Sequence, residues 1–502
     1  MILDEWKSAQ RQRVIRYAHF DRRISLEQCW KYISSPESVA IHAFMPFIHY
    51  TITTRKVKNG KKQPPKKREI FYAAHKDAWI YRYYSYLLNE QYNARVQQDG
   101  IDSVAVAYRN NFKGRNNIDF ANDAFRFIQS CRSCCVMIGD FTSFFDNISH
   151  PYLKKELCDL LNVECLPPDY YAIFKSVTRF SYAEMNDLLD YYKLEKNKNG
   201  QKQLNQRDKL LDTKTIRAWK KVFKKNPNLP EAKGVPQGSP ISAVLANVYM
   251  LKADKQIYEY VSALQGFYMR YSDDFMVVIP NTAPVDFRKH YETICGFITE
   301  AGGIEIKAEK TRIFSVENGV IRNCIADVIL GQENGKNLID FLGFSFDGKK
   351  IRLREKTISK YYNRMHRKAV TIFKCSGVTK KGNRINANEL YKKYSYKGSA
   401  AYQNRKAAIN GGKHIEGNLF DYLKASKRII GDNFVEVSHL VIWQGFGDLL
   451  MGSRESITNN AAMERISRVR SMSRFLRSRN LSKRADISVL SALSDALEAS
   501  AS

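Results

Sequence analysis

Two features that would place the chain in a membrane or outside the cell are missing from the sequence. No apolar stretch approaches the roughly 18 residues of a membrane-spanning helix. Residues 1–5, Met-Ile-Leu-Asp-Glu, also lack the apolar core of a signal peptide. We therefore expect a cytoplasmic protein that has no membrane as a partner.

The sequence also lacks the paired Cys/His groups of a structural metal site. Nine cysteines, an odd number in a chain without a leader, are typical of reduced thiols. Cys131, Cys134 and Cys135 could be taken for half a zinc site, but no second Cys/His group with ligand spacing lies nearby. Because free cysteine is among the most buried residue types, we interpret these thiols as core residues.

The sequence has fewer acidic residues than basic ones. The 51 Asp and Glu residues are outnumbered by 81 Lys and Arg residues, which leaves a formal charge of +30 on a chain that is 44% hydrophobic. This combination describes a folded protein with a basic surface rather than a disordered polycation, and its partner should be a polyanion. With 502 residues, the chain has room for two or three domains, each with its own core.

Two of the acidic residues stand side by side at Asp273 and Asp274. They follow Tyr271 and Ser272 and precede an apolar run over residues 275–279, which predicts a β-hairpin with two carboxylates at its tip. Adjacent carboxylates resist burial unless cations neutralise them, so our first hypothesis is a two-metal site for phosphoryl transfer. A solvated Asp-Asp turn is the alternative.

A third carboxylate and a tight turn accompany this pair. Asp140 ends an apolar run that begins at Cys135 and predicts a strand. Residues 234–240 predict a turn that starts a helix, with Ser239 as the N-cap and Pro240 at the first helical position. Backbone N–H groups at a helix start attract anions, and Gln237 would lie just before that start, over the substrate.

In this order, the strand that ends at Asp140, the turn at 236–240 and the block at 271–274 resemble the palm of a reverse transcriptase. Residues 66–70 resemble the fingers, and residues 108–112 resemble the segment before the palm. Residues 302–311 resemble the motif after the catalytic hairpin, and residues 341–344 resemble the primer-grip turn. The resemblance covers roughly residues 50–350.

The resemblance implies an α+β chain with the right-hand polymerase fold, in which fingers and a palm with an antiparallel sheet precede a mainly helical, basic thumb and C-terminal domain. We expect the N-terminal region and fingers at 1–130, the palm at 131–350 and the thumb and C-terminal domain at 351–502. An insertion at about 169–229 would interrupt the palm and begin with helix over 170–193. Amphipathic helices are predicted over 357–374 and 418–430.

The resemblance also assigns metal ligands and a proton donor. Asp140 and Asp273 would bind two Mg²⁺ ions, for which Mn²⁺ could substitute. Asp274 and the backbone carbonyl of Phe141 would be further ligands. Lys310 would protonate the leaving pyrophosphate, although a lysine at a strand edge is equally interpreted as a surface charge.

Four residues are expected to recognise the incoming dNTP. Gln237 and Gly238 would contact the nucleotide, and Arg68 its phosphates. Phe145 stands five residues after Asp140, where the family has an aromatic residue that packs under the sugar and excludes a 2′-hydroxyl. Core packing is the alternative for Phe145, and a solvated loop is the alternative for the basic stretch around Arg68.

Duplex is expected to bind after the palm. Residues 351–430 contain twenty Lys and Arg but only four Asp and Glu. Lys360, Arg364 and Arg367 cluster on the predicted helix over 357–374, which resembles a thumb helix that follows the phosphate backbone. A solvated basic face is the alternative, and the same two alternatives apply to the basic amphipathic segment at 454–484.

A palm followed by about 150 helical, basic residues is most similar to the abortive-infection and unknown-group reverse transcriptases of bacterial antiviral defence. That similarity implies an RNA template, specifically an associated non-coding RNA, a DNA product and homo-oligomers. It also implies priming from the protein itself in some members, for which Tyr391, Tyr394, Tyr396 and Tyr402 are candidates, since nearby cations would favour a phenolate. Packing against thumb helices or stacking on nucleic acid is the alternative for these tyrosines. An intron- or retroelement-encoded reverse transcriptase and a non-catalytic RNA-binding scaffold with a polymerase fold are the alternatives.

Overall fold

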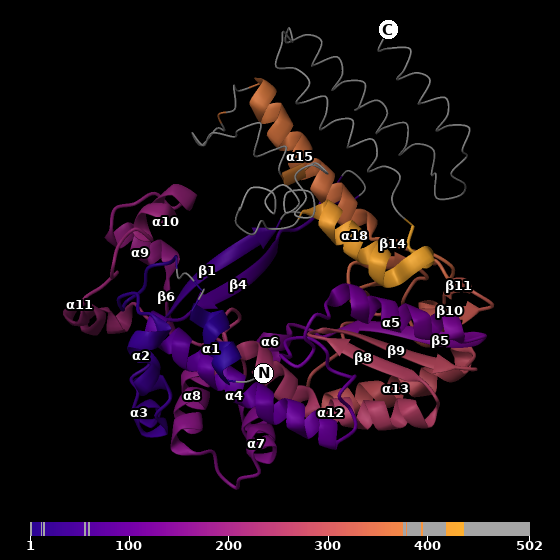
Figure 1. Ribbon diagram of the computed structural model, residues 1–502, viewed down its shortest axis with the longest axis horizontal. Coiled ribbons are helices and arrows are strands. Elements are labelled where there is room, and N and C mark those ends of the chain that lie inside the picture. The colour runs from indigo at the N-terminus through magenta and orange to yellow at the C-terminus, as the bar shows by residue number, and fades with distance from the viewer. Residues whose placement is uncertain are drawn as a thin grey trace. The chain divides into compact units, whose positions relative to one another are not determined.

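The computed structural model describes residues 3–54 except 12, 14 and 15, then 57–58, 61–374, 378, 393–394 and 418–435. The chain forms two compact units, Met1–Ile351 and Arg352–Ser502, which are called the first and second units below. Helices and mainly antiparallel sheets both occur along the first unit (Figure 1), so the expected α+β class is confirmed. The segment at 454–484 and Tyr391, Tyr396 and Tyr402 lie outside the described residues.

The N-terminal helices and a long aromatic helix form one side of the first unit. Helix α2 has a capping box in which Ser25 and Gln28 exchange hydrogen bonds, because both belong to residue types that satisfy the free N–H groups of a helix start. In α4, Trp79, Tyr81, Tyr84 and Tyr92 are among the largest fully buried side chains, so these four rings belong to the core. The helices are α1 (Leu3–Arg11), α2 (Leu26–Ile33), α3 (Pro36–Ala40) and α4 (His75–Gln98).

A four-stranded sheet with the order β4-β1-β6-β7 forms the fingers. Strands β1 (Phe47–Thr54) and β4 (Lys66–Tyr72) are antiparallel, and their buried half lies toward Phe47 and Tyr72 while their other half is exposed. Strands β6 (Ser181–Glu184) and β7 (Lys224–Lys225) complete this sheet, whereas β2 (Val57–Lys58) and β3 (Lys61–Lys62) pair with each other in a separate two-stranded sheet. The exposed half of β4 carries the basic residues Lys66, Lys67 and Arg68.

The segment expected as an insertion is built into the fingers sheet. Strand β6 pairs in parallel with β1, and β7 pairs with β6. The helix expected over 170–193 is therefore wrong in its middle, because β6 separates α8 from α9 and its pairing with a distant strand overrides local helix preference. The other elements are α8 (Pro168–Thr178), α9 (Met185–Tyr191), α10 (Lys198–Leu204), α11 (Thr213–Ala218), η1 (Trp219–Lys221) and η2 (Leu229–Glu231).

The palm is a five-stranded antiparallel sheet with the order β11-β10-β5-β9-β8, as expected. Helices α12 and α13 lie along one face of this sheet and α5 along the other (Figure 1). Burial on both faces explains why β5 and β9 are almost continuously apolar. The elements are α5 (Asn117–Ser130), β5 (Ser133–Asp140), α12 (Ser242–Ala263), β8 (Phe267–Tyr271), β9 (Asp274–Pro280), α13 (Pro284–Glu300), β10 (Arg312–Glu317) and β11 (Val320–Asn323).

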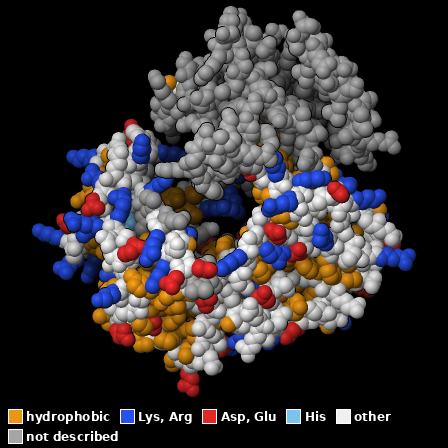
Figure 2. Space-filling model, viewed as in Figure 1, with side chains coloured by type: hydrophobic (Ala, Val, Ile, Leu, Met, Phe, Trp, Pro, Cys, Tyr) orange, Lys and Arg blue, Asp and Glu red, His pale blue; other side chains and the backbone are white. Residues whose placement is uncertain are grey.

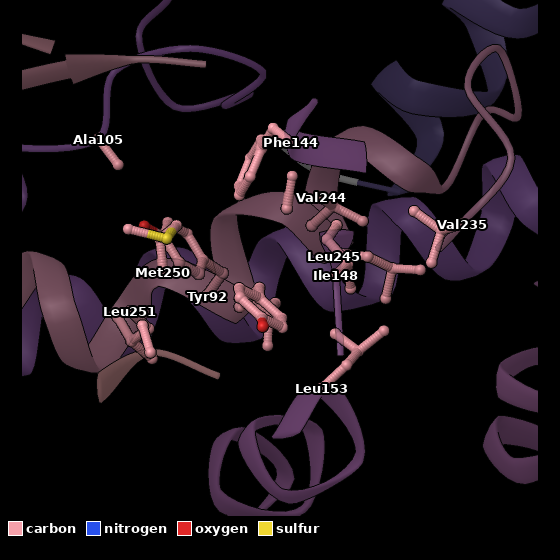
Figure 3. Packing of buried hydrophobic residues seen from close by; sticks show 14 of the residues in the cluster. Tyr92, Ala105, Phe144, Ile148, Leu153, Val235, Val244, Leu245, Met250 and Leu251 are labelled. Carbon is pink, nitrogen blue, oxygen red and sulfur yellow. The ribbon is translucent and has the colours of Figure 1, made fainter. Parts of the chain in front are cut away.

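One hydrophobic core joins the palm to α4. Val235, Ile148 and Leu153 converge on α12, where Val244 and Leu245 meet them (Figure 3). Cys134 and Cys135 are buried in β5, which confirms them as core thiols. The shorter elements are α6 (Phe144–Asn147), α7 (His150–Leu161), η3 (Ala308–Lys310), α14 (Ile325–Val328), β12 (Ile339–Phe341), β13 (Phe344–Phe346) and β14 (Ile351–Leu353).

The second unit is described at two helices and their flanks. Helix α15 (Glu355–Lys374) begins two residues before the predicted position, and α18 (Leu419–Ile430) follows an Asn418–Asp421 capping box and leads into η4 (Gly431–Asn433). Both helices are where the amphipathic pattern predicted them. Throughout the described ranges, no helix is long and apolar enough to cross a membrane.

Candidate active site

Asp140 and Asp274 lie opposite each other at one end of the palm sheet. Strands β5 and β9 pair in a register that makes their Cα atoms direct partners. The residue before Asp140 must be glycine, because a Cβ on Gly139 would lie 2.3 Å from the Phe275 ring. The packed Phe275 ring and the bare Gly139 backbone therefore hold the two strands in the register that brings the carboxylates together.

Asp273 occupies the tip of the expected hairpin. The turn contains only Ser272 and Asp273, because Tyr271 and Asp274 pair across it, and Ser272 adopts a positive φ of 64°. The Asp273 carbonyl accepts a hydrogen bond from the Phe141 N–H at 3.4 Å. This bond fixes the hairpin tip beside the end of β5, so the structure brings Asp140, Phe141, Asp273 and Asp274 into one neighbourhood.

Lys310 reaches the same neighbourhood from a distant part of the sequence. Its Nζ forms an ion pair with the Asp140 carboxylate. The backbone of the preceding segment is fixed to β5 as well, since the Lys307 N–H donates to the Asp140 carbonyl at 3.0 Å. Lys310 is therefore placed next to the acidic group rather than left as an unpaired surface charge.

The donor set of this neighbourhood suits a hard divalent ion. Carboxylate and carbonyl oxygens are the ligands that Mg²⁺ prefers. The Asp140 carboxylate already pairs with one cation, the Lys310 ammonium. Within the part of the chain that the structure describes, no three His, Cys, Asp or Glu side chains are grouped so that they could hold a metal ion. Asp140, Asp273 and Asp274 thus fit the implied metals by chemistry and position, while their side chains are not gathered around a common point.

The turn that carries Gln237 is pressed against the fingers. The Gln237 carbonyl accepts a hydrogen bond from the Phe71 N–H of β4 at 2.8 Å. Gly238 has a φ of 111°, and a Cβ there would lie 2.8 Å from the Phe71 carbonyl oxygen. Only glycine allows this approach, so Gly238 sets the position of Gln237 relative to β4.

The predicted start of the following helix is wrong. Helix α12 begins at Ser242 with Ile241 as its N-cap and has no side-chain cap, whereas Ser239 was expected to cap it. Residues 237–238 and 240–241 form turns instead, and the Ser242 hydroxyl donates to the Pro236 carbonyl at 2.8 Å. These turns separate Gln237 from the helix start, and the buried Ser239 Oγ has no partner.

Arg68 and Phe145 lie near the turn that carries Gln237, and the hydrogen bonds that join their segments to this turn are made by the backbone. Arg68 is exposed on β4, three residues before Phe71, which corresponds to about 10 Å of strand. Phe145 is half-buried in α6, packs against the main core, and its carbonyl accepts from the Val235 N–H at 2.9 Å. The sugar-gate and core roles of Phe145 are both compatible with this position.

The basic residues expected on the thumb lie in the second unit. Lys360, Arg364 and Arg367 are all exposed on α15. Their spacing of four and three residues places them on one face of that helix. The sequence therefore predicted both the helix and its basic stripe.

Sequence reasoning missed Arg270, a buried residue that is hydrogen-bonded to the backbone of the hairpin that carries Asp273. Arg270 is completely buried, and its Nη1 donates to the Ser272 carbonyl at 3.0 Å. Burial opposes its charge, but the neighbouring Asp254 carboxylate raises the pKa of Arg270 above its ordinary value. An arginine within the apolar strand before the hairpin was the available signal, because a charge is rarely buried there without a partner.

A hollow opens between the fingers strands and the palm on the face shown in Figure 2, with Lys and Arg side chains at its rim. Side chains of this sign attract phosphate groups.

The family described as "Reverse transcriptase (RNA-dependent DNA polymerase)" matches residues 88–346. No curated protein matches the chain. Among solved structures, apo telomerase from Candida tropicalis, truncated from its C-terminal domain, has a TM-score of 0.38 and 13% identity, over 61% of this chain and 55% of that one. Telomerase from Candida albicans, in complex with a TWJ fragment of telomeric RNA, has a TM-score of 0.38 and 11% identity, over 84% of this chain and 61% of that one.

Proposed function

The chain belongs to the reverse transcriptase (RNA-dependent DNA polymerase) family, and we propose that it copies an RNA template into DNA from dNTPs. The observation that carries this proposal is the pairing of Asp140 with Asp274 at the end of β5 and β9, with Asp273 at the hairpin tip between them. A scaffold without catalysis has no use for three neighbouring carboxylates, which repel one another.

Asp140, Asp273 and Asp274, with the Phe141 carbonyl, would hold the two divalent ions, which we take to be Mg²⁺. When bound, such ions favour ionisation of the primer 3′-hydroxyl and neutralise charge on the leaving group. In the reaction, the primer oxygen forms a bond to the α-phosphorus of the dNTP as the bond to pyrophosphate breaks. Lys310 would leave Asp140 and transfer a proton from its Nζ to the pyrophosphate.

The residues around the turn would position the dNTP. Gln237 is fixed through its carbonyl to β4, so its side chain is presented from a rigid backbone between fingers and palm. Arg68, further along β4, is exposed and would reach the phosphates as a bidentate donor. Phe145 would lie under the sugar and exclude ribonucleotides.

The biological setting that we propose is bacterial antiviral defence, with a non-coding RNA as the template partner, homo-oligomers and a cytoplasmic location. The support is the family membership together with the strongly basic segment that follows the palm. An intron or retroelement enzyme is the second candidate. Sequencing the RNA that copurifies with the protein separates them, because an intron enzyme should retain its own structured intron RNA.

Self-priming is the most specific part of this proposal, and the tyrosines differ in their suitability. Tyr394 is only 6% exposed, and its ring lies 5.1 Å from that of Tyr361. Burial raises the pKa of Tyr394 even though Arg364 and Arg367 act in the opposite direction. The expected phenolate is therefore wrong for Tyr394, and the proposal passes to the other three tyrosines.

A primer-extension assay tests the polymerase proposal directly. Purified protein receives an RNA template with a DNA primer, the four dNTPs and either Mg²⁺, Mn²⁺ or EDTA. We expect metal-dependent extension whose product is complementary to the template. Extension that ignores the template sequence, or an absence of any incorporation with either metal, would contradict the proposal. Reactions without primer test self-priming, since the DNA should then remain attached to protein after denaturation and phenol extraction.

A further inference from the structure

A cavity of about 500 Å³ lies in the first unit next to the turn that carries Gln237. It is called the α1–α4 cavity here, and its lining comprises Trp6, Gln10, Arg13, Arg82, Ser85 and Tyr86, with five further residues that include Asn89, Tyr108 and Gly238. The six named first all precede residue 88, where the family match begins. Six of the eleven lining residues thus precede the segment that the family match covers.

Three buried polar atoms around the α1–α4 cavity have no hydrogen-bond partner. They are Gln10 Oε1, Arg82 Nη1 and Asn89 Oδ1. Asn89 is only 7% exposed, and its amide orientation is set because Nδ2 donates to the Tyr108 carbonyl at 2.8 Å. Because a buried polar group without a hydrogen bond is costly, a polar ligand that pairs all three atoms would be favoured here.

The charges around the α1–α4 cavity favour an anion. Burial lowers the pKa of Arg82, and the nearby positive charge of Arg13 lowers it further. Among the lining residues that the structure describes, there are two guanidinium groups and no carboxylate. An anion placed between Arg13 and Arg82 would remove their repulsion and satisfy the free Nη1 atom.

Aromatic side chains provide the third property of the site. Trp6 and Tyr86 line the cavity with their ring centroids 5.4 Å apart, and Tyr108 lines it as well. Stacking on such a ring favours the binding of a nucleobase of any sequence. The Tyr108 hydroxyl is also hydrogen-bonded to Ser272 Oγ at 2.9 Å, which connects the cavity to the catalytic hairpin.

We propose that the α1–α4 cavity binds one nucleotide, at a position separate from the dNTP site at Gln237. The phosphate would accept hydrogen bonds from Arg82 and Arg13. The N–H groups of the base would donate to the free amide oxygens of Gln10 and Asn89, and its ring would stack on Trp6 or Tyr86. The volume of about 500 Å³ lies within the ordinary range for small-ligand sites. Two sources supply this chemistry, an unpaired nucleotide of an RNA strand and a free nucleotide.

Photo-crosslinking locates the site and separates the two sources. One arm uses 8-azidoadenosine 5′-monophosphate, and the other uses a short RNA with a single 8-azidoadenosine. Both arms contain EDTA, so divalent ions that would support dNTP binding are absent. We expect labelled peptides from α1 and α4. Labelling by both probes identifies a site that accepts a free nucleotide, and labelling by the RNA alone identifies a strand nucleotide. The absence of labelled α1 and α4 peptides with both probes overturns the proposal, whereas additional labelling by the RNA at other positions is expected from template binding.

Charge variants test the assignment of the phosphate position. Arg82→Gln and Arg13→Gln should each raise, by tenfold or more, the probe concentration that gives half-maximal labelling of α1 and α4. Arg13 is exposed, so its variant should fold even if Arg82→Gln does not. Arg95→Gln is the matched control on the same helix, because Arg95 pairs with Asp99 and does not line the cavity. Equal labelling of the Arg13 variant and this control contradicts the proposal. Polymerisation is not measured here, so a failed result leaves the polymerase proposal untouched.

Discussion

Arg270 and Asp254 form an ion pair from which water is fully excluded, directly beneath the catalytic hairpin. Arg270 Nη2 lies 2.6 Å from Asp254 Oδ2, and both side chains are 0% exposed. Tyr268 donates a further hydrogen bond to this carboxylate, from its hydroxyl to Oδ1 at 2.8 Å. Because Arg270 also donates to the Ser272 carbonyl, the pair determines where the backbone of Asp273 lies.

We predict that Asp254→Asn lowers both stability and polymerisation. The change leaves the buried Arg270 charge without its counterion, which costs roughly 3–5 kcal/mol of unfolding free energy. Chemical denaturation measures the loss. The matched control is Lys255→Met on the same helix, whose partly exposed pair with Asp99 should contribute no more than about 1 kcal/mol.

A double variant separates the positioning role from the structural one. Replacing the pair with apolar residues, Arg270→Met with Asp254→Leu, removes the unpaired charge and should recover most of the lost stability. Extension should stay low, because the Ser272 carbonyl no longer has its donor. Full recovery of both properties would show that the pair does not position the hairpin.

Asp273→Asn and Asp140→Asn are each expected to reduce primer extension by about a thousandfold or more. Each change removes an anionic metal ligand at nearly constant volume, and metal ions contribute several kcal/mol to the transition state of phosphoryl transfer. Nucleic-acid binding and the melting temperature should change little. Extension close to that of the unmodified protein would contradict the two-metal assignment.

Phe145→Ala is expected to raise the ratio of rNTP to dNTP incorporation by roughly tenfold or more, because it opens space for a 2′-hydroxyl. Phe144→Ala is the matched control. Phe144 is 4% exposed and lies in the main core, so its loss should lower stability without changing sugar selectivity. If the two variants have the same selectivity, Phe145 is a core residue.

Replacing Lys360, Arg364 and Arg367 together with Gln should make RNA–DNA duplex binding less dependent on salt. Each phosphate contact contributes about 0.7–0.9 to the slope of log affinity against log salt, so losing three contacts should lower the slope by about 2–3. Binding is titrated at several salt concentrations. Lys214, Arg217 and Lys221, three exposed basic residues in the fingers, form the control triplet. Equal changes for both triplets would indicate a general charge effect.

His19 is expected to make the protein less stable at pH 5 than at pH 7. Burial lowers its pKa to about 3, against an ordinary value of 6.5. The Phe20 N–H donates to Nδ1 at 2.8 Å, so the folded state requires an unprotonated Nδ1. The unfolded state therefore binds the extra proton between these two pKa values, and stability is lost as the pH falls below 6.5.

The loss should reach about 2 kcal/mol between pH 7 and pH 5, measured by denaturant unfolding. His19→Gln should be less stable at pH 7 but should show a smaller change across this range. The same pH dependence in both proteins would mean that other groups cause it.

The sequence by itself determined the strands and the hairpin of the palm. The run from Cys135 to Asp140 and the run after Asp274 are apolar because both faces of the sheet are covered, and this local pattern is readable without any tertiary information. The same is true of the basic stripe on α15, which follows helical spacing. Local periodicity was sufficient for these elements.

Only the tertiary structure decided how the site is completed. Lys310 meets Asp140 across 170 positions of sequence, and β6 joins β1 in a sheet that no local pattern indicates. The start of α12 moved to Ser242 because turns between the fingers and the palm replaced the expected cap. Such contacts depend on which distant segments pack together, and that choice is made by the whole core rather than by the residues on either side of a motif.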